Sequence, residues 1–227
     1  MPTALVTGAS GGLGAAIATA LAATHTLLLG GRPSPRLDEV ADRLGATTWP
    51  LDLADTDSLA ASTEVIDQLD VLVHNAGVAF PDHLADSTLD DWRNTFEVNV
   101  IGAVALTQAL LPALRRAEGQ VIFINSGAGL NVLPGMASYS ASKFALRAFA
   151  DSLRAEEPTL RVTSVHPGRI GTRMQRRLRE FEGGEYDESA YLRPETVADT
   201  VAKVITTPAD GAVHQVIIRQ RSVRPRG

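Results

Sequence analysis

Short apolar runs alternate with helical patterns along the whole chain, and this alternation limits the possible folds more than any other feature. The apolar runs predict strands at residues 3–7, 26–30, 47–51, 71–74, 120–125, 161–166 and 213–218. Helical patterns separate them at residues 12–23, 36–44, 55–68, 88–116, 137–156 and 194–205. Strands that alternate with helices predict βαβ units and a parallel sheet. Near-continuous apolar strands are typical of a sheet that is covered on both faces.

We therefore expect an α/β fold with a single domain over residues 1–227. Its core should be a doubly wound parallel sheet of the Rossmann type, with about seven strands and helices on both faces. The length of 227 residues suits one large domain better than two. In such sheets the ligand site lies at the carboxyl ends of the strands.

Composition excludes several classes of function. The net charge of −5 does not suggest nucleic-acid binding, and the chain has no cysteine for disulfides or thiolate metal sites. The five histidines lack metal-ligand spacing, and we find no apolar run long enough to span a bilayer. We expect a cytoplasmic protein without a metal, a membrane or a nucleic-acid partner. We interpret the basic tail as a solvated or disordered end; its arginines are Arg219, Arg221, Arg224 and Arg226.

A glycine-rich loop follows the first predicted strand and precedes the first helix. Its glycines Gly8, Gly12 and Gly14 stand in the stretch Thr7-Gly8-Ala9-Ser10-Gly11-Gly12-Leu13-Gly14. Glycines let backbone amides approach a pyrophosphate at a helix N-terminus. No Gly-Lys-Ser/Thr follows, so the loop lacks the lysine that phosphoryl transfer requires. Ile17 replaces the third glycine of the usual dinucleotide pattern, but the position of the loop still predicts dinucleotide binding.

The end of the second strand indicates which dinucleotide is bound. An acidic residue there would bind the ribose 2′-hydroxyl and select NAD. This chain has Gly30-Gly31-Arg32, and Arg32 can grip a 2′-phosphate with its planar fork. Ser10 can add a hydrogen bond. We therefore favour NADP(H) over NAD(H), and we interpret Asp38 as a solvated residue of the next helix.

Tyr139 and Lys143 are candidates for proton transfer. Four residues apart on a predicted helix, they lie on one face, one turn from each other. Alone, such a pair is more often a surface contact between helical residues. A free tyrosine titrates near ~10, and we expect the Lys143 ammonium to favour the phenolate and lower the pKa of Tyr139. Ser126 stands upstream, directly after the fifth predicted strand.

Together these motifs resemble the short-chain dehydrogenase/reductase family (SDR) over nearly the whole length. The matching segments follow the family's order: the glycine loop, Asp52-Leu53, Asn75-Ala76-Gly77, Asn99, Ser126, Tyr139 with Lys143, and Pro167-Gly168 with Thr172. His74 stands where a second asparagine is common. The resemblance implies hydride transfer between NADP(H) and a carbonyl or secondary alcohol.

The same resemblance assigns roles to single residues. Tyr139 would donate or accept the proton, and Ser126 would hold the carbonyl oxygen. Lys143 would lower the tyrosine pKa and bind the nicotinamide ribose, and Asn99 would hold a water that relays protons to Lys143. The residues expected to bind the cofactor are Gly8, Ser10, Gly12, Leu13, Gly14, Arg32, Asp52, Leu53, Asn75, Ala76, Gly77, Tyr139, Lys143, Pro167, Gly168 and Thr172.

We expect a cofactor half at about residues 1–118 and a catalytic and substrate half at about 119–221. Residues 169–192 are polar and glycine-broken, so we interpret them as a small, mobile lid over the substrate. The residues expected to line the pocket are mostly apolar, which favours an apolar carbonyl or alcohol. We expect Arg169 to pair with lid carboxylates rather than with an acidic substrate.

Two other functions stay open at this point. The chain could be a non-catalytic dinucleotide-binding sensor or scaffold, although such proteins often lose the tyrosine or the lysine. It could also be an NAD-dependent alcohol dehydrogenase of the same fold. The helices at 88–116 and 137–156 pair across a two-fold axis in the family, so we expect a homodimer, with a tetramer as the alternative.

Overall fold

The computed structural model describes residues 1–221, except for the side chains of residues 57, 60 and 61. Arg224 and Arg226 of the basic tail lie outside the described residues. The strands form one parallel sheet, as predicted, and their order is β3-β2-β1-β4-β5-β6-β7. They are β1 (Thr3–Thr7), β2 (Thr26–Gly31), β3 (Thr47–Pro50), β4 (Val71–His74), β5 (Gln120–Ile124), β6 (Arg161–Pro167) and β7 (Gln215–Ile218).

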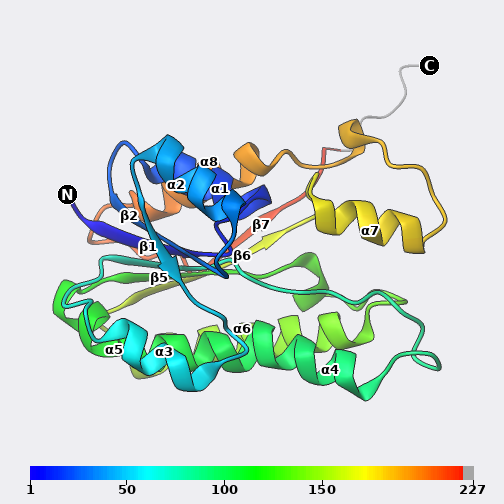
Figure 1. Cartoon of the computed structure of the whole chain (residues 1–227), viewed down its shortest axis with the longest axis horizontal. Coiled ribbons are helices and arrows are strands. Elements are labelled where there is room, and N and C mark those ends of the chain that lie inside the picture. Colours follow the sequence, from blue (N-terminus) through cyan, green and yellow to red (C-terminus); the bar gives the residue numbers. More distant parts are fainter. Residues whose placement is uncertain (222–227) are drawn as a thin grey trace.

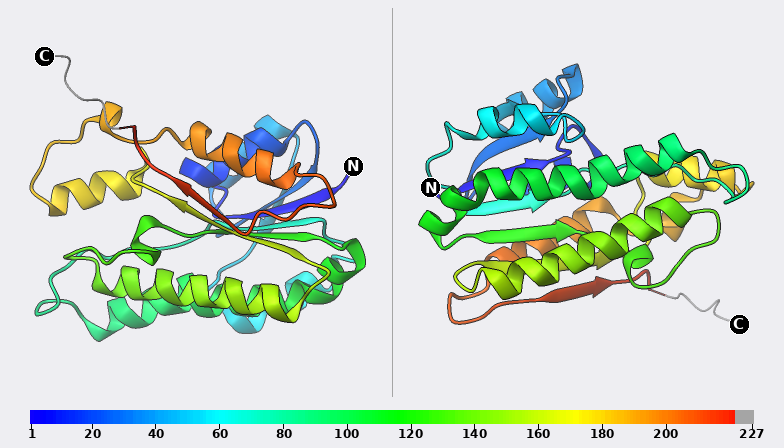
Figure 2. Two further views of the ribbon diagram at one scale, coloured as in Figure 1. Left: turned by 180° about the vertical axis from the view of Figure 1, so that it is seen from behind. Right: turned by 90° about the horizontal axis from the view of Figure 1, so that it is seen from below.

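Helices cover both faces of the sheet (Figure 1). On one face lie α1 (Gly12–Leu21), α2 (Pro35–Leu44) and α8 (Pro194–Ile205). On the other face lie α3 (Thr56–Thr63), α4 (Leu89–Phe96), α5 (Gly102–Ala117) and α6 (Ala137–Glu156). Figure 2 shows α5 and α6 side by side beneath the sheet. The fold is therefore the doubly wound α/β arrangement that the alternating pattern predicts.

The strands divide their side chains between two cores. Successive side chains of a strand point to opposite faces, so Ala4 and Val6 of β1 join the cluster under α1 and α8. Leu5 between them joins the cluster under α5 and α6, where Phe123 of β5 is fully buried. Because both faces are covered, the strands read as continuous apolar runs.

The direction of winding reverses between β1 and β4, and this reversal decides where a ligand can bind. From β1 the chain winds outward through β2 to β3, then returns to β4 on the other side of β1. The loops after the two central strands therefore diverge and leave a crevice at the carboxyl edge of the sheet. The loop after β1 and the segment after β4 face each other across this point.

The long predicted helix at 88–116 is interrupted by a π-helical turn. Thr88 caps α4 as the sequence predicts, because its hydroxyl accepts a hydrogen bond from the Asp91 N–H at 3.1 Å. A π-helix at Glu97–Ile101 then separates α4 from α5 and contains Asn99. Single π-turns inside helices often occur at functional sites.

Residues 89–117 also correct an expectation about membranes. Among the described residues this is the one helix long and apolar enough to cross a membrane by length and composition, with a mean hydropathy of 1.5. The expectation from the sequence is that no apolar run is long enough to span a bilayer. Leu106, Leu110 and Leu114 of this helix are fully buried against the sheet, so its apolar character also serves the core.

Several other boundaries differ from the prediction, and one helix was missed. The helix expected to reach residue 68 ends at Thr63, and the last strand begins at Gln215 rather than at 213. A helix within the expected lid was missed: α7 (Arg173–Phe181) begins at the Thr172 cap. The signal for this helix is present, because Met174, Leu178 and Phe181 stand at helical spacing, but the surrounding charged residues and glycines favoured a polar lid instead.

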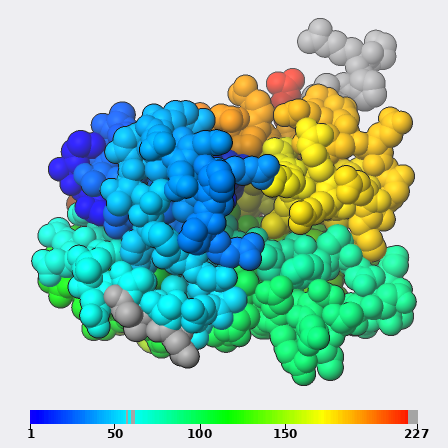
Figure 3. Space-filling model, viewed as in Figure 1, coloured from blue at the N-terminus to red at the C-terminus, as the bar shows by residue number. Residues whose placement is uncertain are grey.

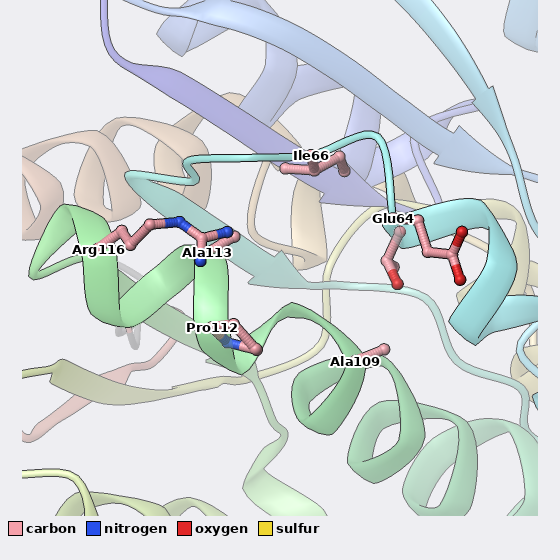
Figure 4. A pocket seen from close by; sticks show the side chains of 7 residues that line it. Glu64, Ile66, Ala109, Pro112, Ala113 and Arg116 are labelled. Atoms are coloured by element: carbon pink, nitrogen blue, oxygen red, sulfur yellow. The ribbon is translucent and has the colours of Figure 1, made fainter.

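A surface hollow between α3 and α5 lies away from the carboxyl edge (Figure 4). Its volume is about 240 Å³, and it is lined by Thr63, Glu64, Ile66, Ala109, Pro112, Ala113 and Arg116. It includes none of the residues that the sequence assigns to a site.

Candidate active site

The glycine loop docks tightly against the segment after β4. The Asn75 side-chain amide donates to the carbonyl oxygens of Thr7 (2.9 Å) and Gly8 (3.3 Å). A Cβ atom on Gly8 would lie 2.9 Å from the Ala76 Cα, and one on Gly14 would lie 2.2 Å from the Gly8 carbonyl oxygen. Close backbone packing within the glycine loop and against the segment after β4 therefore requires glycine at positions 8 and 14.

The N-terminus of α1 suits a bound pyrophosphate. Gly11 at its N-cap provides no side-chain hydrogen bond, whereas Ser34, Thr88 and Thr172 cap α2, α4 and α7 with theirs. The first-turn amides of α1 are thus free of a capping side chain, and the helix dipole favours an anion there. Together with the glycine packing, this arrangement fits a dinucleotide.

The other residues expected to bind the cofactor lie along the same edge. Arg32 is exposed just after β2, and Ser10 is half-buried in the glycine loop. Leu13 is buried in the core, so only its backbone can serve a ligand. Asp52 follows β3 and accepts a hydrogen bond from the Ala54 N–H at 3.0 Å. Leu53 is also buried; its carbonyl oxygen lies against Gly102.

Ser126 and Tyr139 come together at the ends of β5 and α6. Ser126 follows β5 with extended backbone, and its hydroxyl oxygen accepts the Ala128 N–H at 3.1 Å. Tyr139 lies in the first turn of α6, where its phenol interacts with the Ser126 side chain. The structure therefore brings these two candidate residues together.

Lys143 reaches the same place from the next turn of α6. Its ammonium nitrogen lies 5.7 Å from the centre of the Tyr139 ring and donates to the Ile124 carbonyl oxygen at 3.1 Å. The side chain is buried, and burial lowers the pKa of Lys143 from 10.5 to about 8. A Cβ atom on Gly77 would lie 3.7 Å from this nitrogen, so glycine leaves the space above Lys143 open.

The pKa of Tyr139 differs in direction from the expectation. Burial raises the pKa of the Tyr139 phenol above 10.0, and the hydrogen bond with Ser126 opposes that rise. The lowering by Lys143 predicted from the sequence is not observed. The physical reason is that the ammonium binds a main-chain carbonyl, while a low-dielectric setting penalises the phenolate.

The Asn99 side chain forms hydrogen bonds with the main chain at Val78 and with the Ser142 side chain. Its Oδ1 atom accepts the Val78 N–H at 2.8 Å, and its Nδ2 group donates to the Val78 carbonyl oxygen at 2.9 Å and to Ser142 Oγ at 3.0 Å. Ser142 in turn donates to the Tyr139 carbonyl oxygen at 2.8 Å. The Asn99 side chain therefore fixes Val78 and the first turns of α6.

The segment after β6 carries the expected nicotinamide-side residues and the lid. Pro167 ends β6, and the Gly168 N–H donates to the Ile218 carbonyl oxygen at 2.7 Å. The Thr172 methyl group lies 3.5 Å from the position of a Gly12 Cβ, so the lid begins beside the glycine loop. A bridge between Ile170 and Leu192 closes the base of the lid.

One ion-pair cluster lies within the lid, and one aromatic side chain joins the lid to the rest of the chain. Arg169 forms a bidentate ion pair with Glu182, as expected, and Arg179 also binds that carboxylate. Phe181 packs against Gly135, in the loop that leads to Tyr139, and against the His83 ring at 5.3 Å between ring centres. Figure 3 shows the lid in yellow beside the blue N-terminal elements and above the green segment that precedes α5.

His74 is a buried polar residue that the sequence analysis assigned no role. Its Nε2 atom lies 2.8 Å from the Thr107 hydroxyl, which itself donates to the Ala103 carbonyl oxygen. His74 Nε2 must therefore be the donor. Burial, and then the charge of Lys143, lowers the pKa of His74 to about 3, so the ring is neutral. The hydrogen bond between His74 and Thr107 joins β4 to α5, the helix that follows the π-turn.

Comparison with known proteins agrees with this geometry. A family model described as short chain dehydrogenase matches residues 2–183. The human dehydrogenase/reductase SDR family member 11 is 30% identical over 95% of this chain and 93% of its own length. The glycine betaine reductase ATRR of Emericella nidulans is 35% identical over 96% of this chain, but the chain spans only 18% of that protein.

Among solved structures, the alcohol dehydrogenase from Thermococcus sibiricus, complexed with 5-hydroxy-NADP, has a TM-score of 0.88. It is 28% identical, and the match covers 100% of both chains. The chain thus belongs to the short-chain dehydrogenase/reductase family. Relatives in this family were solved with NADP or an NADP derivative.

Burial of Lys143 predicts a measurable effect on stability. Below pH 8 the folded protein must hold a desolvated ammonium, so Lys143→Met should raise the free energy of unfolding at pH 7 without cofactor. Between pH 8 and 10.5 the unfolded chain binds more protons than the folded chain at this group. The free energy of unfolding of wild type, relative to that of the variant, should therefore increase as the pH rises. Urea unfolding across this pH range measures the difference.

Lys203→Met is the matched control, because Lys203 is exposed on α8. Its stability relative to wild type should change little over the same range. A gap between wild type and Lys143→Met that stays constant from pH 8 to 10.5 would contradict the burial effect.

Proposed function

We propose that this protein is an NADP(H)-dependent oxidoreductase that interconverts a carbonyl and a secondary alcohol, with Tyr139 as acid and base. The observation that carries the proposal is that Ser126, Tyr139 and the buried Lys143 meet at the end of β5, next to the segment that packs on the glycine loop. A bound reduced nicotinamide supplies the hydride. The residues named here would bind the carbonyl oxygen and supply its proton.

Ser126 and Tyr139 have different roles at the carbonyl oxygen of the substrate. Ser126 Oγ accepts the Ala128 N–H, and its hydroxyl hydrogen would be donated to the substrate oxygen. The raised pKa keeps Tyr139 protonated at neutral pH, so it can donate a proton as negative charge develops on that oxygen. In the oxidative direction the same hydroxyl would have to lose its proton, which burial disfavours. This supports reduction as the direction favoured at neutral pH.

Arg32 supports NADP(H) as the cofactor. It is exposed just after Gly31, where a carboxylate would select NAD, and Asp38 is exposed on α2 instead. The Thermococcus sibiricus relative was solved with an NADP derivative, which agrees with this assignment. The 2′-phosphate would be held by the Arg32 guanidinium.

The surroundings of the site support an apolar substrate. Leu133, in the loop before α6, and Met174, on α7 of the lid, are 38% and 40% exposed. The Arg169 guanidinium, which could otherwise bind an acidic substrate group, is paired with the Glu182 carboxylate. A substrate with a free carboxylate would have to displace that pair, whereas an apolar group would cover leucine and methionine.

The Tyr139→Phe variant tests the mechanism. Loss of the hydroxyl should slow NADPH-dependent reduction of a ketone and aldehyde panel by about 10²-fold or more, because a general acid contributes about that much. NADPH binding should persist. The loss of cofactor absorbance measures turnover, and fluorescence titration measures binding.

Tyr186→Phe is the control, since it removes a lid hydroxyl away from Ser126. It should stay within a few-fold of wild type. Unchanged turnover in Tyr139→Phe would refute the assigned mechanism. A wild-type protein that binds NADPH but turns over no carbonyl would favour the sensor or scaffold alternative.

The Arg32→Ala variant tests the cofactor. Removal of a charged hydrogen bond should weaken NADPH binding by about tenfold or more, while NADH binding changes little. Arg36→Ala is the control, because Arg36 is also exposed but lies on α2. Equal losses for both cofactors in Arg32→Ala, or tighter binding of NADH than NADPH by wild type, would favour the NAD-dependent alternative.

We also propose a homodimer through the face that α5 and α6 present to solvent. Ile101 is 47% exposed and Phe144 is 39% exposed at this face. Their burial against a second copy would remove apolar surface from water. Light scattering should give about twice the chain mass, and a monomer at all concentrations would exclude the dimer.

A further inference from the structure

The main chain of Ser126 is held by hydrogen bonds at both of its polar groups. Its N–H donates to the Asn125 side-chain oxygen at 2.9 Å. Its carbonyl oxygen accepts the Gly129 N–H at 3.0 Å and lies 3.0 Å from Nδ1 of His166. The first two contacts are local, whereas His166 comes from the neighbouring strand β6.

The contact with Ser126 determines the tautomer of His166. A carbonyl oxygen can only accept, so Nδ1 must carry the ring hydrogen. His166 is fully buried, and Nε2 has no hydrogen-bond partner within the described part of the chain. Burial lowers the pKa of His166, and the Ser126 hydrogen bond partly opposes this. The ring is therefore a neutral donor aimed at the serine.

His166 is in turn fixed by the end of β7. Arg219 donates from Nη1 to the His166 carbonyl oxygen at 3.1 Å. The same guanidinium nitrogen would lie 3.1 Å from a Cβ atom on Gly127, so it packs against the residue that follows Ser126. Arg219, interpreted from the sequence as part of a solvated tail, instead joins the ends of β5, β6 and β7.

We propose that His166 is a positioning residue that sets the orientation of Ser126 for the reaction. The inference rests on the proposed function, because Ser126 acts there on the substrate oxygen. Without the His166 bond, Ser126 keeps its Gly129 bond, so the fold loses little while the serine gains freedom. Small displacements of a reacting group can cost about 10²-fold in rate.

A pair of matched variants isolates the Nδ1 donor. His166→Asn places an amide N–H at the Nδ1 position, and His166→Gln places it at the Nε2 position instead. We expect kcat of His166→Asn to stay within about threefold of wild type and kcat of His166→Gln to fall by about tenfold or more. NADPH affinity should be unchanged in both. Equal kcat values for the two variants would overturn the proposal.

A double-mutant cycle shows whether His166 acts through Ser126. In the Ser126→Ala background, single-turnover rates of the Asn and Gln variants should be the same, because the group to be positioned is gone. A Gln defect that persists unchanged in that background would mean that His166 acts by another route. If the Ser126→Ala rate is too slow to measure, the Asn–Gln comparison decides alone.

Nitrogen-15 NMR of the histidine rings tests the geometry without turnover. We expect a neutral His166 ring protonated at Nδ1, assigned by its absence from the His166→Asn spectrum. A ring protonated at Nε2 would overturn the inference even in an active enzyme. Lack of turnover by wild type on any carbonyl would count against the proposed function alone, since the NMR result stands apart from it.

Discussion

The hydrogen bonds between Thr7 and the segment after β4 hold the two halves of the site together. Thr7 Oγ1 donates to the Val73 carbonyl oxygen at 3.2 Å and accepts the N–H groups of Asn75 (3.0 Å) and Ala76 (3.1 Å). Asn75 returns a bond to the Thr7 carbonyl oxygen. Because the winding reverses here, these bonds set the distance between the glycine loop and the catalytic side of the sheet. If they were lost, the loop and Lys143 would no longer share one crevice.

Burial determines the charge state of the candidate proton-transfer pair. It raises the pKa of Tyr139 and lowers that of Lys143 to about 8, so both shifts favour the neutral form of each group. The neighbouring His74 is neutral for the same reason, with a pKa of about 3. A low-dielectric setting also strengthens the interactions of any charge that develops there. The site thus combines a protonated phenol with a lysine poised near physiological pH.

Much of this arrangement could be predicted because it depends on local patterns. The order of strands and helices follows from periodicity, and the Thr88 cap follows from turn chemistry. The glycine loop and the Tyr139–Lys143 spacing could be predicted for the same reason, because each is a pattern within a short stretch of sequence. The hydrogen bonds of the Asn99 side chain could not be predicted. The π-turn that contains Asn99 has no sequence signature, and its partners Val78 and Ser142 are distant in sequence.

The direction of the Tyr139 pKa shift could not be predicted either. Spacing along a helix shows that a lysine lies one turn away, but it does not show what the ammonium binds. In the fold it binds the Ile124 carbonyl oxygen, and burial outweighs attraction. His166 and Arg219 were missed in the same way, since a histidine in a strand and an arginine near the C-terminus carry no local signal of their contacts.

The sequence by itself determined the alternation of elements, the doubly wound class of fold and the residue types available at the carboxyl edge. These depend on interactions between residues close in the chain, which period and turn chemistry encode. Only the tertiary structure decided which of those residues meet, what the side chains of Asn99 and Arg219 bind, and which ionisation state burial favours at Tyr139. Those outcomes depend on desolvation and on contacts between strands far apart in the sequence, and no local pattern contains them.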